Sequence, residues 1–569
     1  MNMKDKFQLV QPRNEIEIHL PDGRVLSGPR GAPVGDFLAA IEHDSQLVGA
    51  VINGDLRELT FPVGMDSRVT PITMSTPDGT RIYRRSLTFL LEMVFADMYP
   101  HATLFIDHSV ASGGYYCQVK GRKPLSESEL GVLKVLMQKI VKDDLPFVRK
   151  EVPLKEAMEY FLSRGEEDKV QLLKYRRKPY LTLYSLNERL DYHHGYMVPS
   201  TGYLRWFDLV PTGDGFTLLY PSRNNPNELL PMPEYPKLLA TFLQYGGWLE
   251  KLGIENVGAL NDAIESGRGD EIVLVSEAFH EQRLAQIARQ VAEKIEHAHL
   301  ILVSGPSSAG KTTFSKRLMV QLLALGISPF PLELDNYFLP RDKTPLGEDG
   351  KPDFEALEAL DLPVLADHLQ KLIHGDEVQL PHYNFRTGMR EVGEVIRLAR
   401  GQPIILEGIH GLEPRLIPES LSDEAFRIYI SALTQLNLDR HNRVSTTDTR
   451  LLRRIVRDAR ERGYTASQTI SRWESVRRGE TKYIFPFQEN ADVMFNSALV
   501  YELAALKPLA EPLIRQVQHG TPEYIEAKRL LAFLEWFVPL DINLVPETSI
   551  MREFLGGSIL KDFTVWKNK

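Results

Sequence analysis

One octapeptide, GPSSAGKT at Gly305–Thr312, restricts the fold of this chain more than any other stretch of its sequence. It fits the pattern G-x-x-x-x-G-K-[ST], and it lies between an apolar run typical of a buried strand and an amphipathic helical pattern. Glycines let backbone N–H groups curve around phosphate oxygens, and a helix N-terminus adds partial positive charge. The sequence therefore predicts a phosphate-binding loop that opens an α/β domain.

The expected ligand of this loop is a nucleoside triphosphate such as ATP, together with Mg²⁺. We expect Lys311 to reach the β- and γ-phosphates and the Thr312 hydroxyl to ligate the metal. The other predicted nucleotide-binding residues are Gly305, Ser307, Ser308, Ala309, Gly310 and Thr313. A chance match in a glycine- and serine-containing loop is the alternative, and the strand and helix on either side argue against it.

Two acidic residues follow apolar strands downstream of the loop. Asp335 comes just past a strand end in FPLELDNYF, and Glu407 ends the strand in QPIILEGIHGL. Open α/β sheets bind their ligands at the carboxyl ends of strands. A carboxylate at Asp335 can accept the proton of an attacking hydroxyl, and one at Glu407 can hold Mg²⁺. Each residue alone is also compatible with a polar strand-end cap; their joint presence behind a phosphate loop favours catalysis.

A predicted helix near residue 450 carries four arginines on one face, at Arg450, Arg453, Arg454 and Arg457. Like charges on one helical stripe repel one another unless an anion meets them. The structural alternative is a solvated face balanced by Asp458 and Glu461. We favour a lid that brings Arg454 and Arg457, with Arg462 as a third candidate, to the transferring phosphoryl group.

Residues 299–500 resemble the uridine kinase/phosphoribulokinase group of P-loop kinases. The matching pieces are SGPSSAGKTT, LDNYF, DFEALEALDL, LPHYNFRTGMR, IILEGIHGL and LLRRIVRDARERG, in family order. The resemblance implies a phosphotransferase with an alcohol group as acceptor, and it assigns Asp335 as the general base. It implies that the substrate-binding residues are Glu355, Tyr383, Phe385, Arg390 and Arg462, while Asp361 and Glu358 cap or position the acceptor loop.

The acceptor itself stays open at this point. Uridine kinases typically have histidine where this chain has Gly388, arginine at Tyr464 and glutamine at Arg472. We expect a nucleoside, and a non-nucleoside sugar or sugar phosphate is the alternative. The segment Leu433–Arg450 also looks longer than the usual link. Its polar groups could build a different pocket or form a solvated loop; they are His441, Arg443, Thr446, Thr447 and Asp448.

The N-terminal part resembles the first half of threonyl-tRNA synthetase. Residues 14–75 are similar to the ubiquitin-like TGS domain, with hairpin turns predicted at Asp22-Gly23 and Asn53-Gly54. Residues 84–222 resemble the editing-type second domain, on RRSLTFLLEMVFADMYP, DLPFVRKEVPLKEAMEYF and HHGYMVPSTG. The synthetase catalytic core does not follow. These likenesses predict a multidomain chain of α/β and α+β parts, with a parallel-sheet kinase domain and a helical tail.

The stretch LDYHHGYMVPSTG raises the question of a metal site. In the synthetases, an H-x-x-x-H helix and a later C-x-x-x-H surround a zinc-compatible pocket. Alignment places Arg85, Phe89, His193 and Met197 at those four positions, so one plausible ligand remains. We therefore interpret this domain as a binding or regulatory module that has lost its hydrolytic site. These replacements argue against the hypothesis of a deacylase that acts on aminoacyl-tRNA.

We expect five segments: 1–78 TGS-like, 79–223 synthetase-like, 224–298 connector and helices, 299–500 kinase, and 501–569 helical tail, with REFLGGS as a structural turn. The net charge of −9 argues against chain-wide nucleic-acid affinity, although tRNA or a nucleotide could regulate through the N-terminal half. A rival reading is a tRNA- or nucleotide-sensing protein whose P-loop acts as a switch. The single Cys117 favours a reducing cytoplasm, and no apolar run is long enough to span a membrane. We also expect a homo-oligomer without membrane contact.

Overall fold

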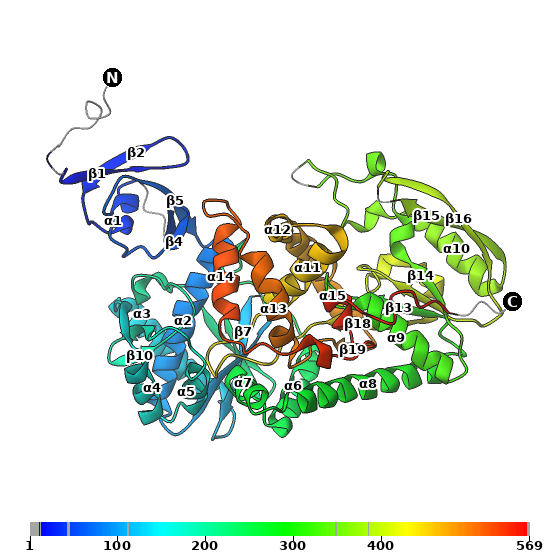
Figure 1. The fold of residues 1–569 in the computed structure, drawn as a ribbon, viewed down its shortest axis with the longest axis horizontal. Helices are drawn as coiled ribbons and strands as arrows, with labels where there is room; N and C mark the ends of the chain where they lie inside the picture. Colours follow the sequence, from blue (N-terminus) through cyan, green and yellow to red (C-terminus); the bar gives the residue numbers. More distant parts are fainter. Residues whose placement is uncertain are drawn as a thin grey trace. The chain divides into compact units, whose positions relative to one another are not determined.

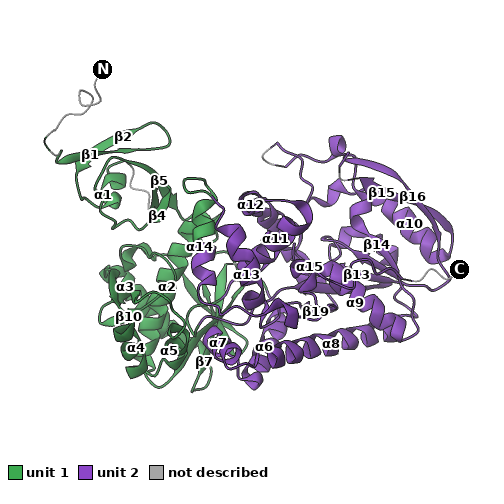
Figure 2. Cartoon of the chain, viewed as in Figure 1, with its two compact units in different colours: residues 1–233, 439–443, 518–528 green, residues 234–438, 444–517, 529–569 purple. Residues whose placement is uncertain are grey.

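The computed structural model describes residues 11, 13–41, 46–110, 113–347, 350–384 and 386–565. The chain divides into two compact units, shown in different colours in Figure 2. Unit 1 comprises residues 1–233, 439–443 and 518–528, and unit 2 comprises residues 234–438, 444–517 and 529–569. The short segment Asp439–Arg443 therefore belongs to unit 1, although it lies between two stretches of unit 2 in the sequence.

Unit 1 begins with a five-stranded sheet in the order β2-β1-β5-β3-β4. Its elements are β1 (Glu15–His19), β2 (Val25–Pro29), α1 (Val34–Ala39), β3 (Leu47–Ile52), β4 (Asp55–Arg57) and β5 (Ser67–Thr73). Both expected hairpins are present, because β1 pairs antiparallel with β2 and β3 with β4. Asn53 and Gly54 supply the positive φ angles, 51° and 88°, that the tighter turn requires. Ile18, Val34 and Ala50 lie in the core.

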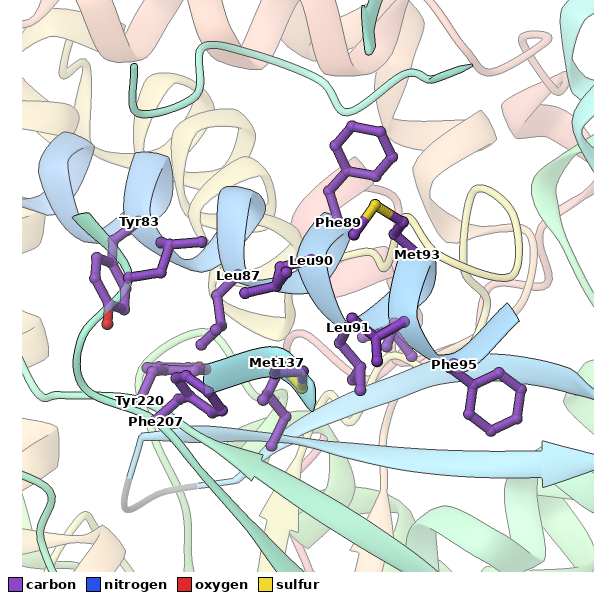
Figure 3. Packing of buried hydrophobic residues seen from close by; sticks show 14 of the residues in the cluster. Tyr83, Leu87, Phe89, Leu90, Leu91, Met93, Phe95, Met137, Phe207 and Tyr220 are labelled. Atoms are coloured by element: carbon purple, nitrogen blue, oxygen red, sulfur yellow. The ribbon is translucent and has the colours of Figure 1, made fainter. Parts of the chain in front are cut away.

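The rest of unit 1 is an α+β fold built around the long helix α2 (Pro77–Met98). Thr76 caps this helix by accepting a hydrogen bond from the Gly79 N–H, and Pro77 fits its first turn. Figure 3 shows its apolar face, including Leu87, Leu90 and Leu91, packed in the core that also contains Met137. This burial fixes which residues of α2 face the interior.

Two further sheets accompany α2, in the orders β11-β12-β7-β6 and β10-β9-β8. The elements are β6 (Thr103–Val110), β7 (Gly114–Lys120), α3 (Glu127–Asp143), β8 (Val148–Pro153), α4 (Leu154–Ser163), α5 (Glu167–Leu173), β9 (Tyr180–Leu186), β10 (Arg189–Asp191), β11 (Asp208–Thr212) and β12 (Gly215–Leu219). Ser126 and Glu129 form a capping box at the start of α3.

Unit 2 contains a five-stranded parallel sheet in the order β14-β17-β13-β18-β19 (Figure 1). The strands are β13 (Leu300–Ser304), β14 (Phe330–Glu333), β17 (Ile404–Glu407), β18 (Ala425–Ser431) and β19 (Val493–Asn496). Every residue of the central strand β13 is buried. A continuous apolar run of this kind suits a parallel strand that is covered on both faces.

Helices and one hairpin surround this sheet. They are α6 (Pro236–Leu252), α7 (Val257–Glu265), α8 (Gly269–Lys294), α9 (Lys311–Ala324), α10 (Leu362–His374), the hairpin β15 (Glu377–Asn384) and β16 (Met389–Arg397), α11 (Thr446–Arg462), α12 (Ala466–Tyr483), α13 (Glu502–Ile514) and α15 (Arg552–Leu555). Helix α14 (Tyr524–Leu534) starts in unit 1 and ends in unit 2. The predicted combination of α/β and α+β parts is confirmed. None of the helices in the described ranges is long and apolar enough to cross a membrane.

Candidate active site

The predicted phosphate loop joins β13 to α9, as its sequence context requires. Gly310 has φ +88°, and a Cβ there would lie 2.6 Å from Cγ2 of Ile550. A Cβ on Gly305 would lie 1.9 Å from the Ile430 carbonyl oxygen. Both fixed glycines of the pattern are therefore demanded by the backbone and its neighbours. Lys311 is the first residue of α9, so the loop ends at a helix N-terminus.

Glu407 lies beside this loop because of the sheet register. Strand β17 pairs with β13 so that Glu407 stands opposite Val303, two residues before the loop begins. The Thr312 hydroxyl donates a hydrogen bond of 2.8 Å to Oε1 of Glu407. Burial raises the pKa of Glu407 to about 7, and Lys311 opposes that rise. A hydroxyl and a carboxylate form the hard oxygen donor set that Mg²⁺ prefers, so the pair fits this ion.

Asp335 follows β14, the outermost strand next to β17, in a short 3₁₀ turn over Leu334–Tyr337. The residue keeps access to solvent, yet the surrounding protein raises the pKa of its carboxyl by desolvation. Lys311 and Arg462 act in the opposite direction on that pKa. A partly desolvated carboxyl near a cation is suited to accept a proton from a substrate hydroxyl.

The proposed substrate-binding acid, Glu355, is close to α12. A Cβ on Gly479 would lie 2.9 Å from Cβ of Glu355, so this glycine permits the approach. Burial raises the pKa of Glu355 to about 7, Glu480 raises it further, and Arg454 and Lys311 lower it. Lys311 thus acts on Asp335, Glu355 and Glu407 alike, which places the three carboxyls within electrostatic reach of one ammonium.

The predicted acceptor-pocket residues have different surroundings. Tyr383 is buried, its N–H donates to Oδ1 of Asn336 at 3.2 Å, and its ring packs on Phe338. Arg390 stands opposite Tyr383 in the hairpin and donates to Asp361 at 2.7 Å. Asp361 also caps α10 by accepting a hydrogen bond from the Val364 N–H. Phe385 lies outside the described residues.

Helix α11 corrects the interpretation of the arginine stripe. Arg450 and Arg453 are 1% and 0% exposed, and they form ion pairs with Glu480 of α12 and Glu502 of α13. The anions that offset these like charges are therefore carboxylates of the protein, so these two arginines do not face an open site. Arg454 differs, because its Nη1 donates to Oγ of Ser307 in the phosphate loop at 2.8 Å.

The pair of Arg450 and Glu480 also holds the phosphate loop, a role that no sequence motif indicates. Oε1 of Glu480 accepts from the Ser307 N–H at 3.1 Å, and Nη1 of Arg450 donates to the Ser307 carbonyl at 3.1 Å. Both backbone groups of Ser307 are thereby satisfied by one buried ion pair.

The C-terminal tail also reaches the loop through α15. Oε2 of Glu553 accepts from the Thr313 hydroxyl at 2.9 Å, and its Oε1 lies 3.6 Å from Nη1 of Arg457. Arg457 and Arg462 both contact Asp458, at 3.2 and 3.4 Å. The expectation of a plain structural turn at REFLGGS missed this carboxylate, since its partner is distant in sequence.

The histidine loop of unit 1 shows what replaces the aligned synthetase ligands. Arg85 donates to the Tyr196 carbonyl at 2.6 Å, Phe89 packs on the His193 ring at 5.3 Å, and Met197 is buried. Burial lowers the pKa of His193 to about 4 and that of His194 to about 3, so both imidazoles are neutral. Packing and backbone contacts thus occupy these three positions.

Two groups of known proteins are similar to this chain. Residues 300–504 match the family model described as Phosphoribulokinase / Uridine kinase family. The chain is 29% identical over 199 residues to threonine–tRNA ligase of Geobacter sp. strain M21, covering 35% of this chain and 31% of the ligase. It is 28% identical over 198 residues to threonine–tRNA ligase 2 of Bacillus subtilis strain 168, covering 34% and 31%. The chain spans about a third of the length of these curated relatives.

Solved structures with partial likeness include a putative fructose transport system kinase from Silicibacter sp. TM1040, with 19% identity and a TM-score of 0.27. That match covers 37% of this chain and 98% of the other. A possible uridine kinase from Bacillus stearothermophilus matches with 18% identity and a TM-score of 0.26, covering 38% of this chain and 97% of that one. The sequence matches thus show a region similar to the phosphoribulokinase/uridine kinase family behind an N-terminal part similar to threonine–tRNA ligases.

Proposed function

We propose that the protein transfers the γ-phosphoryl group of ATP to a hydroxyl group of a small molecule. The observation that carries this proposal is the arrangement around Lys311. The Lys311 ammonium lowers the pKa of three carboxyls. They are Glu407 beside the Thr312 hydroxyl, Asp335 after the end of β14, and Glu355 beside α12. A switch or sensor needs the loop and the metal-binding pair, but it has no need of Asp335 as a proton acceptor.

In the proposed reaction, the loop N–H groups and Lys311 hold the phosphates, and Arg454, already on Ser307, meets the charge of the transferring group. Mg²⁺, held through Thr312 and Glu407, would neutralise charge between the phosphates. The oxygen of the acceptor hydroxyl attacks the γ-phosphorus while Asp335 accepts the hydroxyl proton, and ADP leaves.

We propose a nucleoside as the acceptor, bound by its sugar hydroxyls at Glu355 and in a pocket bordered by Tyr383. The carboxyl of Glu355 offers acceptors for two hydroxyls, which favours a vicinal diol. In this proposal Arg390 donates its hydrogen bond to Asp361 and thereby positions the hairpin of β15 and β16. A sugar or sugar phosphate is the second candidate, because Gly388, Tyr464 and Arg472 depart from the residues that uridine kinases use.

The decisive experiment measures ADP release with ATP and Mg²⁺ over a panel of nucleosides, sugars and sugar phosphates. We expect one acceptor class to stimulate ADP release, and we expect Asp335→Asn to remove that stimulation. Asp367→Asn is the matched control, since Asp367 is an exposed residue of α10 that pairs with Lys371. ADP release that no acceptor stimulates, and that survives Asp335→Asn, would refute a kinase and favour the nucleotide-sensing alternative.

The similarity of the N-terminal half to threonine–tRNA ligases supports a binding role for that half in this proposal. We propose that it binds tRNA or a nucleotide as a regulator, without hydrolysing an ester, because Arg85, Phe89 and Met197 replace the aligned ligands. Addition of tRNA to the kinase assay tests this directly. We expect tRNA to change the KM for the acceptor. Ester hydrolysis of an aminoacyl-tRNA would contradict the proposed role as a regulator without hydrolytic activity.

A further inference from the structure

A buried group of four potential metal ligands lies within unit 1, apart from the candidate active site. Glu92 comes from α2, Asp191 ends β10, His193 follows β10, and His441 comes from the segment Asp439–Arg443. The side chains of these residues are at most 5% exposed. Glu92, Asp191 and His193 each offer a ligand atom within 4.8 Å of the others.

Three of the spacings among these atoms are close to those between the ligands of a zinc ion. Oε2 of Glu92 lies 3.5 Å from Nε2 of His193 and 3.3 Å from Nδ1 of His441. Nδ1 of His441 lies 3.2 Å from Oδ2 of Asp191. Zinc bonds to nitrogen and oxygen measure about 2.0–2.2 Å, so the edges of a zinc tetrahedron measure about 3.3–3.6 Å. Three edges of the cluster thus match that figure within about 0.1 Å.

Atoms of two members of the cluster, Glu92 and His193, also lack ordinary partners. Both carboxylate oxygens of Glu92 and Nε2 of His193 make no hydrogen bond within the part of the chain that the structure describes. Buried polar atoms nearly always have such a partner, because leaving one unmade is costly. The charged or ionisable contacts of Glu92 in the described ranges are the two imidazoles, so no permanent cation pairs with it there.

Lys169 brings a permanent positive charge next to the group. Its ammonium pairs with Asp191, lies 3.1 Å from Oε2 of Glu166, and lies 3.1 Å from Nδ1 of His441. An ammonium only donates hydrogen bonds, so Lys169 bonds to His441 in the tautomer whose Nδ1 carries a lone pair. That is the form of imidazole that binds metals. Glu166 offers Lys169 a second partner if a metal takes the oxygen of Asp191.

We propose that Glu92, Asp191, His193 and His441 form a binding site for one divalent metal ion of the zinc class. Two imidazole nitrogens and two carboxylate oxygens are a donor set that zinc accepts, and the three spacings above fit edges of its tetrahedron. The site is different from the one that the synthetase alignment implies, which would require Arg85, Phe89 and Met197. The earlier interpretation of the histidine loop considered those aligned positions and overlooked Glu92 and His441.

The source of His441 gives the site a structural consequence. Residues 439–443 lie between β18, which ends at Ser431, and α11, which begins at Thr446. A metal bound to His441 would fasten this segment to α2 and β10 within unit 1. The site would therefore cross-link distant stretches of the sequence, because His441 is about 250 positions from Asp191 and about 350 positions from Glu92.

The test uses the full chain, stripped of metal by a chelator and titrated with Zn²⁺ and with Co²⁺ as a spectroscopic probe. We expect about one Zn²⁺ per chain by elemental analysis and visible absorption bands of tetrahedral Co²⁺. Glu92→Gln, His193→Ala and His441→Ala should each weaken binding on the order of tenfold or more. His194→Ala is the matched control, because this neighbouring, partly buried histidine is outside the group. The Zn²⁺ affinity of this variant should be unchanged.

Lys169→Met provides a readout that a merely structural role of the cluster would not produce. Removal of the competing ammonium should raise Zn²⁺ affinity by about tenfold or more. The wild-type titration needs no variant, so poor folding of a variant leaves the test decisive. Absence of the Co²⁺ bands in the wild-type chain would overturn the proposal. Zn²⁺ binding that the three ligand variants leave unchanged would also overturn it, as an adventitious ion only.

Discussion

The ion pair between Arg450 and Glu480 gives a sharp test of how the phosphate loop is held. Both side chains are 1% exposed, and Glu480 accepts from Arg450 and from the Ser307 N–H. Glu480→Gln leaves Arg450 buried without its charged partner. Breaking a buried pair from one side costs about 3–5 kcal/mol, because the remaining charge stays desolvated. We expect the free energy of unfolding of unit 2 to fall by an amount in this range.

Glu461→Gln is the control for this prediction. Glu461 pairs with Arg460 on the same helix as Arg450, but both side chains are substantially exposed. Exposed pairs contribute about 0–1 kcal/mol, so the control variant should unfold almost like the wild type. The measurement is the urea midpoint, followed with a nucleotide-independent probe such as circular dichroism.

The double variant Arg450→Met/Glu480→Leu completes the argument. Removing both charges also removes the desolvation cost, so the double variant should recover most of the stability that Glu480→Gln loses. It should remain impaired as an enzyme, because Ser307 loses two hydrogen bonds. If Glu480→Gln costs no more than Glu461→Gln, the buried pair is not what stabilises this region, and the reasoning fails.

Further predictions concern Mg²⁺, the loop lysine and the tail. Since the pKa of Glu407 is about 7, its carboxyl is mostly protonated below that pH. The affinity for Mg²⁺ should therefore fall about tenfold per pH unit on acidification below pH 7. Glu407→Gln should abolish this pH dependence. Lys311→Ala should abolish ADP release at saturating ATP, whereas Met197→Ala should leave it largely intact; equal losses would show that unit 1 shares in catalysis. Glu553→Gln should raise the KM for ATP several-fold with little change in kcat, measured by ADP release, because Thr313 loses a charged acceptor; an unchanged KM would contradict this.

The features that sequence alone could predict depend on local rules. The phosphate loop is one, because its glycines and lysine are close in sequence and its strand and helix adjoin it. The positions of Asp335 and Glu407 at strand ends are another, since parallel strands bring their carboxyl ends to one edge of a sheet. The arginine spacing also predicted the helix carrying Arg450, which the structure has as α11.

Sequence reasoning failed where a partner comes from a distant element. The stripe of arginines suggested an anion-binding face, but helical periodicity cannot reveal that α12 and α13 present Glu480 and Glu502 to two of them. The same limit applies to Glu553, which reaches Thr313 from 240 positions away. Each of these carboxylates lies on a helix whose sequence has no motif, and its ion pair or hydrogen bond changes the role inferred for the residue it contacts.

The polar segment around His441 shows how strongly such a partner can alter an interpretation. The sequence left two alternatives for it, a second acceptor pocket or a solvated loop. Within unit 1, Asp439 instead accepts from the Tyr192 hydroxyl at 2.7 Å, and Arg440 donates to Asp168 at 2.8 Å. Groups that are buried and paired in this way are available neither to solvent nor to an acceptor. These paired groups favour one arrangement of the segment, because a shift would leave buried charges such as Asp439 without their partners. This segment therefore makes contacts within unit 1, and we propose that the acceptor pocket is built from residues around Asp335 and Glu355.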